Sequence, residues 1–220
     1  MIPEREATIA AADGVRLEAR LAVPPRARAG LVCGHPHPLY GGDMDNPVVM
    51  RVVEVAGALG LATCRFNFRG VGRSTGMHGH GLAERADMEA ALDHLEAEIG
   101  DSPGMVVAGY SFGSMVAARV GAGERRLDGV VLVAPPLAMA KDGPFLDLAA
   151  RGVPVLIVAG SDDEYCPEPA LQSLGDRLPA AHVTVVDGAN HFFAGGLAPL
   201  GEAVGAWLEA RQAGRRAGPA

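Results

Sequence analysis

The sequence predicts an α/β fold in which helices cover both faces of a mostly parallel central sheet. Short, almost continuously apolar segments alternate with amphipathic segments along most of the 220 residues. Strands that are buried on both faces of a sheet need such apolar runs. Residues 15–23 (VRLEARLAV) differ, because apolar and polar side chains alternate there. This period of two is typical of a half-buried strand, so we expect antiparallel pairing in the N-terminal part.

The later apolar segments are rich in β-branched and aliphatic residues. They predict strands at residues 30–34, 62–68, 104–109, 129–134, 153–159 and 182–187. Amphipathic segments predict helices at residues 47–59, 82–99, 112–122, 168–178 and 197–211. The apolar face of the second helix is predicted to consist of Leu82, Met88, Leu92, Leu95 and Ile99. This alternation of strands and helices gives an open sheet with right-handed crossovers.

The chain shows no internal repeat and no linker, so we expect one domain over residues 1–210. The Gly- and Ala-rich residues 211–220 are predicted to form a disordered tail. The connection at 135–152 has 18 residues, which is enough for one short helix but not for a cap domain over the sheet edge.

Charge and cysteine usage limit the function classes. A net charge of −7 argues against nucleic acid or an anionic membrane as a partner. No apolar run reaches the roughly 18 residues of a membrane span and no signal peptide is visible, so we expect a cytoplasmic protein. The three cysteines lack a C-x-x-C pair and are expected to be reduced. Cys33 and Cys64 fall in predicted strands and should be buried, whereas Cys166 falls in a loop and is expected to be more accessible.

The motif G-Y-S-F-G, Gly109 to Gly113, links a predicted buried strand to a predicted helix. A turn this sharp strains the residue at its apex, and the two flanking glycines relieve the clashes with neighbouring chain segments. The hydroxyl of Ser111 then stands above the sheet edge, beside an N–H of the helix N-terminus. This context predicts that Ser111 is a nucleophile. The structural alternative is that Ser111 only caps the helix.

A serine hydroxyl needs a base to take its proton. The best candidate is His191, in the loop after the last predicted strand. The strand at 153–159 is followed by Asp162, Asp163 and Glu164, one of which should orient the histidine. The resulting chain order of serine, acid and histidine suits this architecture and predicts a catalytic triad.

The chain resembles the α/β-hydrolases over nearly its whole length. It is similar in particular to the small, lidless bacterial serine hydrolases with an H-P-H-P-x-x-G-G loop, the esterase and dienelactone-hydrolase group. The segments that carry the resemblance are GHPHPLYGGDMDN (34–46), RFNFRGVGRSTG (65–76), GYSFG (109–113), VAPP (133–136), GSDDEYCP (160–167) and GANHFF (188–193).

The resemblance implies a serine esterase-type hydrolase with no organic cofactor. In this family the acid lies three residues after the strand-end glycine, which selects Asp163 over Asp162. A dienelactone hydrolase would typically carry cysteine at the position of Ser111, so the esterase side of the group is favoured.

An oxyanion hole needs two N–H donors. One should be the N–H of Phe112, directly after the nucleophile. The resemblance points to His37 for the other, and the flanking Pro36 and Pro38 have no N–H to offer. Tyr40 is a second candidate, through its N–H or its hydroxyl.

Other chemistries are less well supported by the sequence. Two H-x-H pairs and two aspartates are candidate metal ligands: His35, His37, Asp43, Asp45, His78 and His80. Neither pair has the spacing of a known zinc motif, so we expect no metal. Gly70 and Gly72 suggest a dinucleotide loop, but Thr75 stands where the third glycine is needed. A non-catalytic binding protein on this fold would be indicated by a broken triad, whereas here every role is filled.

Without a cap, the site should be open and shallow, which favours small ester substrates with short acyl chains. The residues expected to line an apolar groove around the serine are Tyr40, Phe112, Leu137, Met139, Tyr165 and Phe192. The same triad serves thioesters and peptides, so a thioesterase or a peptidase is the alternative. Exposed apolar residues at 137–148 would instead mark a subunit contact, which leaves a homodimer open.

Overall fold

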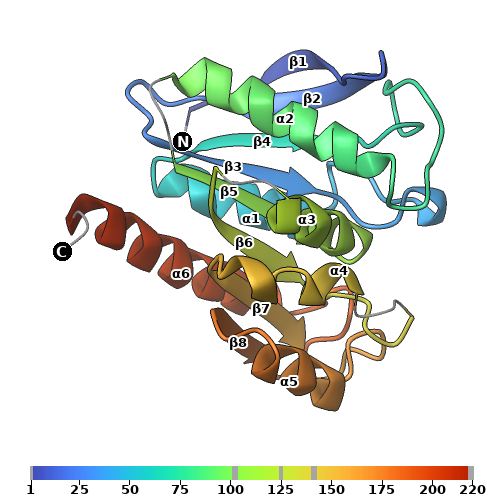
Figure 1. The fold of residues 1–220 in the computed structure, drawn as a ribbon, viewed down its shortest axis with the longest axis vertical. Helices are drawn as coiled ribbons and strands as arrows, with labels where there is room; N and C mark the ends of the chain where they lie inside the picture. The colour runs from blue at the N-terminus through green and yellow to red at the C-terminus, as the bar shows by residue number, and fades with distance from the viewer. Residues whose placement is uncertain (1, 101–103, 124–125, 140–142, 218–220) are drawn as a thin grey trace.

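The computed structural model describes residues 2–100, 104–123, 126–139 and 143–217, and eight strands in this part of the chain form one sheet (Figure 1). Their order across the sheet is β1-β2-β4-β3-β5-β6-β7-β8. The strands are β1 (Arg5–Ala10), β2 (Arg16–Ala22), β3 (Ala29–Gly34), β4 (Ala62–Phe66), β5 (Gly104–Tyr110), β6 (Leu127–Val133), β7 (Val155–Gly160) and β8 (Ala181–Val186).

The strand directions confirm the predicted mostly parallel sheet. β1 pairs with β2 and β2 pairs with β4 in antiparallel register, and all other neighbours are parallel. The alternating segment at 15–23 is β2. Leu17, Ala19 and Leu21 point into the core, and the polar residues between them are less buried. The central strands are buried along their whole length, as their apolar composition predicts.

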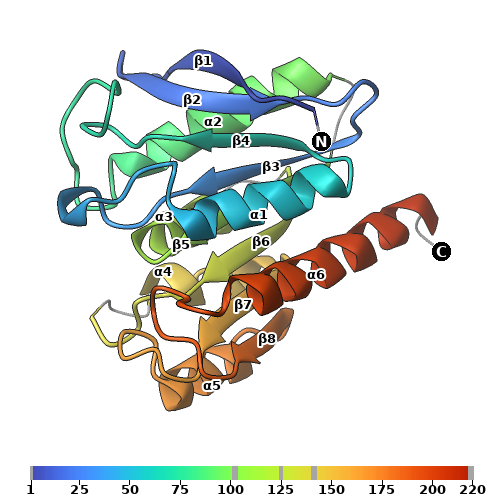
Figure 2. The same ribbon diagram turned by 180° about the vertical axis from the view of Figure 1, so that it is seen from behind.

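Helices cover both faces of this sheet. They are α1 (Pro47–Ala58), α2 (Glu84–Ile99), α3 (Phe112–Gly123), α4 (Gly143–Leu146), α5 (Glu168–Asp176) and α6 (Leu197–Ala217). α1 and α6 lie side by side on the face seen in Figure 2, and the other four lie on the face seen in Figure 1. Each face has its own apolar cluster, so the core consists of two layers separated by the sheet.

Two helix boundaries differ from the prediction. α6 continues to Ala217, so residues 211–217, expected to be disordered, are helical; residues 218–220 lie outside the described residues. The alanines, arginines and glutamine of this stretch are good helix formers. α2 begins at Glu84, so Leu82 lies before the helix and is 67% exposed instead of belonging to its apolar face.

The connection between β6 and β7 contains no cap domain. Its described residues form only α4 and a 3-10 turn at Ala149–Arg151. Phe145 and Leu148 are buried in the core, which removes them from the surface that we considered for a subunit contact. Among the described residues, no helix has the length and apolar character needed to cross a membrane.

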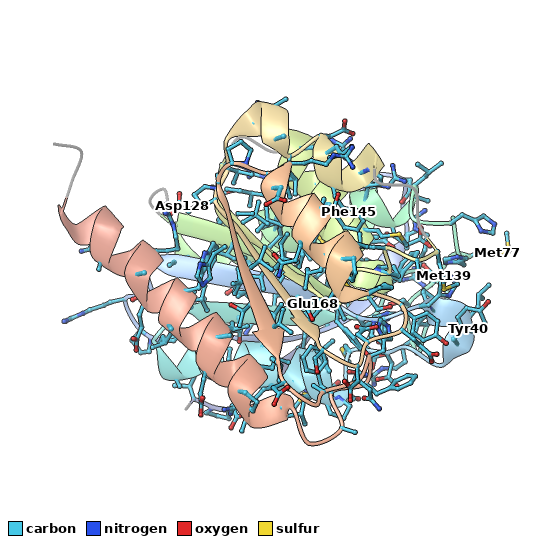
Figure 3. All side chains as sticks on the ribbon, turned by 90° about the horizontal axis from the view of Figure 1, so that it is seen from below. Tyr40, Met77, Asp128, Met139, Phe145 and Glu168 are labelled. Carbon is cyan, nitrogen blue, oxygen red and sulfur yellow. The ribbon has the colours of Figure 1, made fainter. Side chains whose placement is uncertain are left out.

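The parallel strands place the site. Their carboxyl ends meet at one edge of the sheet, where an open α/β fold binds its ligands. Figure 3 shows Tyr40, Met77 and Met139 together at this end of the molecule, and Asp128, near the start of β6, at the other. The loops after β3, β5, β6, β7 and β8 all reach this edge.

Candidate active site

The turn between β5 and α3 is strained at its apex. Ser111 has φ +53°, a left-handed conformation that is unusual for a residue with a side chain. The flanking glycines are required by close packing. A Cβ on Gly109 would lie 2.1 Å from the carbonyl oxygen of Gly113, and one on Gly113 would lie 2.4 Å from that of Gly34. The two glycines therefore let the turn pack against the end of β3.

Three side chains from three loops form a continuous chain of hydrogen bonds. Ser111 Oγ lies 3.0 Å from His191 Nε2, and His191 Nδ1 lies 2.9 Å from both carboxylate oxygens of Asp163. With a proton on Nδ1, the ring donates to the carboxylate and accepts from the serine hydroxyl. The hydroxyl of Ser111 is therefore directed at the histidine rather than placed as a helix cap.

The geometry distinguishes between the two neighbouring aspartates. Asp163 is buried, and its Oδ1 accepts the N–H groups of Tyr165 and Cys166, each at 2.9 Å. Asp162 is exposed and accepts the hydroxyl of Ser161 instead. The backbone donors fix the Asp163 carboxylate in place and offset the cost of burying its charge.

Two tyrosines hold His191. The hydroxyl of Tyr110 donates to the backbone carbonyl of His191 at 2.9 Å, and the ring of Tyr165 lies 4.7 Å from the imidazole. Burial raises the pKa of Tyr110, so its hydroxyl stays protonated and keeps donating. The sequence analysis missed Tyr110. Its one signal is that a tyrosine at the end of a buried strand needs a partner for its hydroxyl.

The loop after β3 is anchored by His35, which is fully buried. Its Nδ1 donates to the carbonyl of Pro36 at 2.7 Å, and its Nε2 accepts the N–H of Phe68 at 3.0 Å. Burial lowers the pKa of His35 to about 4, so the ring is neutral near pH 7 and its Nε2 can accept. His35 thus ties this loop to the segment that follows β4.

The predicted oxyanion donors lie on either side of the serine. Phe112 is the first residue of α3, so its N–H has no acceptor within the helix. His37 precedes a 3-10 turn, and its carbonyl accepts the N–H groups of Tyr40 and Gly42, each at 3.1 Å. The N–H of Tyr40 is therefore already paired, which rules it out as the alternative donor. The Tyr40 side chain is exposed, so only its hydroxyl retains that role.

A cavity of about 590 Å³ opens beside Ser111. Its lining includes five of the six predicted groove residues: Tyr40, Phe112, Met139, Tyr165 and Phe192. The sixth, Leu137, is not part of the lining, because it packs half-buried against the core on the α3 side. The cavity also uses Pro36, Asn46, Met115 and Pro136, which the sequence analysis did not select. Its rim is open, since Tyr40 is 82%, Met139 69% and Phe192 68% exposed.

The residues considered as metal ligands have other partners. Asp45 forms an ion pair with the buried Arg65, and His78 contacts the buried Glu84. Within the part of the chain that the structure describes, no three His, Cys, Asp or Glu side chains are arranged to hold a metal ion. Gly70 and Gly72 have positive φ angles in the turn that follows β4, as a structural role for them predicts.

Cys166 is fully buried, so the expectation that its loop leaves it accessible is wrong. Its N–H is bound to Asp163 and its side chain packs into the core beneath α5, which turns the thiol away from solvent. Burial raises the pKa of the Cys166 thiol to about 12. Cys33 and Cys64 are also buried, as predicted.

Comparison with known proteins agrees with this architecture. A family model described as an alpha/beta hydrolase domain matches residues 28–197. An alpha-beta serine hydrolase homologue from Coxiella burnetii is 32% identical to this chain, with a TM-score of 0.83 over 94% of this chain and 99% of that chain.

Two further solved structures are similar. A protein of unknown function from Agrobacterium tumefaciens is 32% identical, with a TM-score of 0.86 over 96% of this chain and 97% of that chain. A serine hydrolase without a lid from Xanthomonas campestris is 25% identical, with a TM-score of 0.79 over 93% of this chain and 94% of that chain.

Proposed function

Because this chain belongs to the alpha/beta hydrolase family, we propose that it is a serine carboxylesterase that cleaves small, uncharged esters at Ser111. The observation that carries the proposal is the chain of hydrogen bonds from Ser111 through His191 to Asp163, at 3.0 and 2.9 Å. These are distances at which a proton can pass from the hydroxyl to the imidazole.

The first half-reaction forms an acyl-enzyme. Ser111 Oγ attacks the ester carbonyl while its proton moves to His191 Nε2, and Asp163 stabilises the imidazolium through Nδ1. The tetrahedral oxyanion accepts the N–H of Phe112 and that of His37. Collapse of this intermediate breaks the bond to the alcohol, which leaves with the proton from Nε2.

The second half-reaction releases the acid. His191 Nε2 takes a proton from water as the water oxygen attacks the acyl carbonyl. The second tetrahedral intermediate then expels Ser111 Oγ, which recovers its proton from the imidazole. The free acid leaves through the open rim, and the enzyme returns to its starting state.

The lining of the cavity supports an uncharged substrate. Among the described residues that form it, none is Asp, Glu, Lys or Arg. A phosphorylated thioester or a charged peptide would therefore find no ion-pair partner in this part of the site. Apolar side chains such as Met115, Met139 and Phe192 suit an aliphatic or aromatic group instead.

Thioesterase and peptidase activity use the same triad and are the alternatives. A peptidase must protonate a poor amine leaving group and bind an extended chain, and the short connection between β6 and β7 provides little surface for that. A neutral thioester is compatible with the cavity, so the substrate comparison below includes one. A non-catalytic binding protein would not need a serine held at φ +53°.

The test is hydrolysis of p-nitrophenyl esters from acetate to dodecanoate, together with p-nitrothiophenyl acetate and a p-nitroanilide. We expect turnover of the short esters and its loss in Ser111→Ala. Ser173→Ala, an exposed serine on α5, is the matched control and should keep full activity. Turnover of the thioester or anilide in preference to every ester would assign the site to the alternative activity.

A further inference from the structure

Glu84 is a buried carboxylate that the proposed mechanism does not use. It is the first residue of α2 and is 0% exposed. Its Oε1 accepts the N–H of Gly79 at 2.7 Å and its Oε2 accepts the N–H of Gly81 at 2.8 Å. Burying a carboxylate is costly unless several donors surround it, so this side chain serves a defined arrangement of the preceding loop.

That loop, residues 78–81, holds an unfavourable backbone conformation. His80 has φ +56° although it is not glycine, and Gly81 has φ +80°. His80 lies between the two residues whose N–H groups bond to Glu84. The carboxylate therefore offsets the strain by fixing the backbone on both sides of His80.

Glu84 also contacts the side chain of His78. Nδ1 of His78 lies 2.8 Å from Oε1 of Glu84, in a bent approach that falls short of a linear hydrogen bond. The side chain of His78 is 8% exposed. The carboxylate thus holds the imidazole by electrostatic contact as well as holding the backbone beside it.

The ring of His78 packs against the two residues proposed to donate to the oxyanion. Its centroid lies 5.0 Å from that of His37 and 5.4 Å from that of Phe112, and the last two rings lie 5.0 Å apart. Gly81 adds a further contact, since a Cβ there would lie 3.5 Å from the edge of the Phe112 ring. The loop held by Glu84 therefore supports both donor residues at once.

We propose that Glu84 is a positioning residue for the oxyanion hole, acting through His78 on His37 and Phe112. This inference rests on the proposed function, because it presumes that the two N–H groups serve a reacting carbonyl. Oxyanion donors act more strongly on the transition state than on the bound ester. Loosening them lowers kcat and leaves KM nearly unchanged.

The main variants are Glu84→Gln, His78→Ala and His78→Phe. In Glu84→Gln, the amide group would face a backbone N–H with a donor, so one loop contact is lost. Removing an oxyanion donor outright costs about 100- to 1000-fold in kcat, so displacing one should cost about 10-fold. His78→Ala should show a similar loss, and His78→Phe should restore most of the activity, because it keeps a ring between His37 and Phe112.

Two control variants separate positioning from stability. Asp87→Asn removes a second buried carboxylate of α2, one that bonds to Arg69 instead of the loop at 78–81. Glu89→Gln removes a partly exposed carboxylate of the same helix. Both should keep the wild-type kcat at a temperature below their melting points, even where Asp87→Asn is less stable.

The variants are compared by kcat and KM on p-nitrophenyl butyrate, and by the rate at which a fluorophosphonate inactivates each one. In the second reaction Ser111 Oγ displaces fluoride from phosphorus, so it needs the oxyanion hole but no ester turnover. A kcat and an inactivation rate that both fall about 10-fold in Glu84→Gln, with KM within twofold, support the proposal. If Glu84→Gln does not fold, the pair His78→Ala and His78→Phe decides.

The proposal is overturned if folded Glu84→Gln keeps the wild-type kcat and inactivation rate. It is also overturned if the activity of Glu84→Gln and Asp87→Asn falls in step with their melting temperatures, since that is a purely structural effect. A wild-type protein that reacts with the fluorophosphonate but turns over no ester contradicts the proposed function and leaves the inactivation rates to test Glu84. A wild-type protein that does not react at all contradicts both.

Discussion

The hydroxyl of Tyr110 donates to the backbone carbonyl of His191 at 2.9 Å, so the residue before the nucleophile holds the backbone of the base. In Tyr110→Phe that carbonyl loses its buried donor. We expect a loss of about 1 kcal/mol in the free energy of unfolding. We also expect a fall of a few-fold in kcat, because the His191 loop is less firmly placed. Urea unfolding and ester kinetics measure the two effects, and a variant equal to the wild type in both would remove this role.

The neighbouring aspartates provide a matched pair. Asp163→Asn should lower kcat by about 1000- to 10,000-fold, because an amide in place of the carboxylate favours the wrong imidazole tautomer. Asp162→Asn should leave kcat unchanged, because Asp162 is exposed and contacts Ser161 instead. Steady-state kinetics on the same ester compares them. Equal losses in both variants would show that the acid is not assigned to the correct residue.

The buried imidazole of His35 predicts a dependence of stability on pH. Its pKa is about 4 in the folded protein and near 6.5 in the unfolded chain. As the pH falls below 6.5, the unfolded state binds a proton that the folded state does not bind until the pH nears 4. Stability is therefore lost across this window, by up to about 3 kcal/mol from this group alone.

Urea unfolding between pH 7 and pH 4.5 tests this dependence. His35→Gln should lose less stability over the range than the wild type, even if it begins less stable at pH 7. His182→Gln, at an exposed histidine of β8, should follow the wild-type slope. A slope in His35→Gln as steep as that of the wild type would mean that His35 titrates normally in the folded protein.

The three cysteines should be unreactive in the folded protein. All are buried, and burial raises the pKa of Cys64 and of Cys166 to about 12. A disulfide reagent such as DTNB should therefore release almost no chromophore from the native protein and three equivalents in urea. One rapid equivalent in the native state would return Cys166 to the accessible position that its loop suggested.

The sequence predicted those features that depend on local pattern. Runs of buried aliphatic residues located the parallel strands, and a motif at each of three strand ends located Ser111, Asp163 and His191. These residues could be found because an α/β sheet brings the carboxyl ends of its strands to one edge. A reader of the sequence needs only the strand order to place them together.

Features that depend on contacts between distant segments could not be predicted in this way. Cys166 was misplaced because its burial depends on how the β7–α5 loop folds over the core. Leu137 was misplaced because its side chain turns toward α3, a choice made by packing. The role of Glu84 depends on a loop conformation that includes a strained His80, which no spacing in the sequence indicates.

The central claim is that Ser111 is a nucleophile activated by His191. The most direct test is to treat the folded protein with a fluorophosphonate and to locate the adduct by peptide mass spectrometry. We expect one adduct, on Ser111, that is absent from Ser111→Ala, strongly reduced in His191→Ala and retained in Ser173→Ala. An adduct on a different residue, or none on the wild-type protein, would contradict the account.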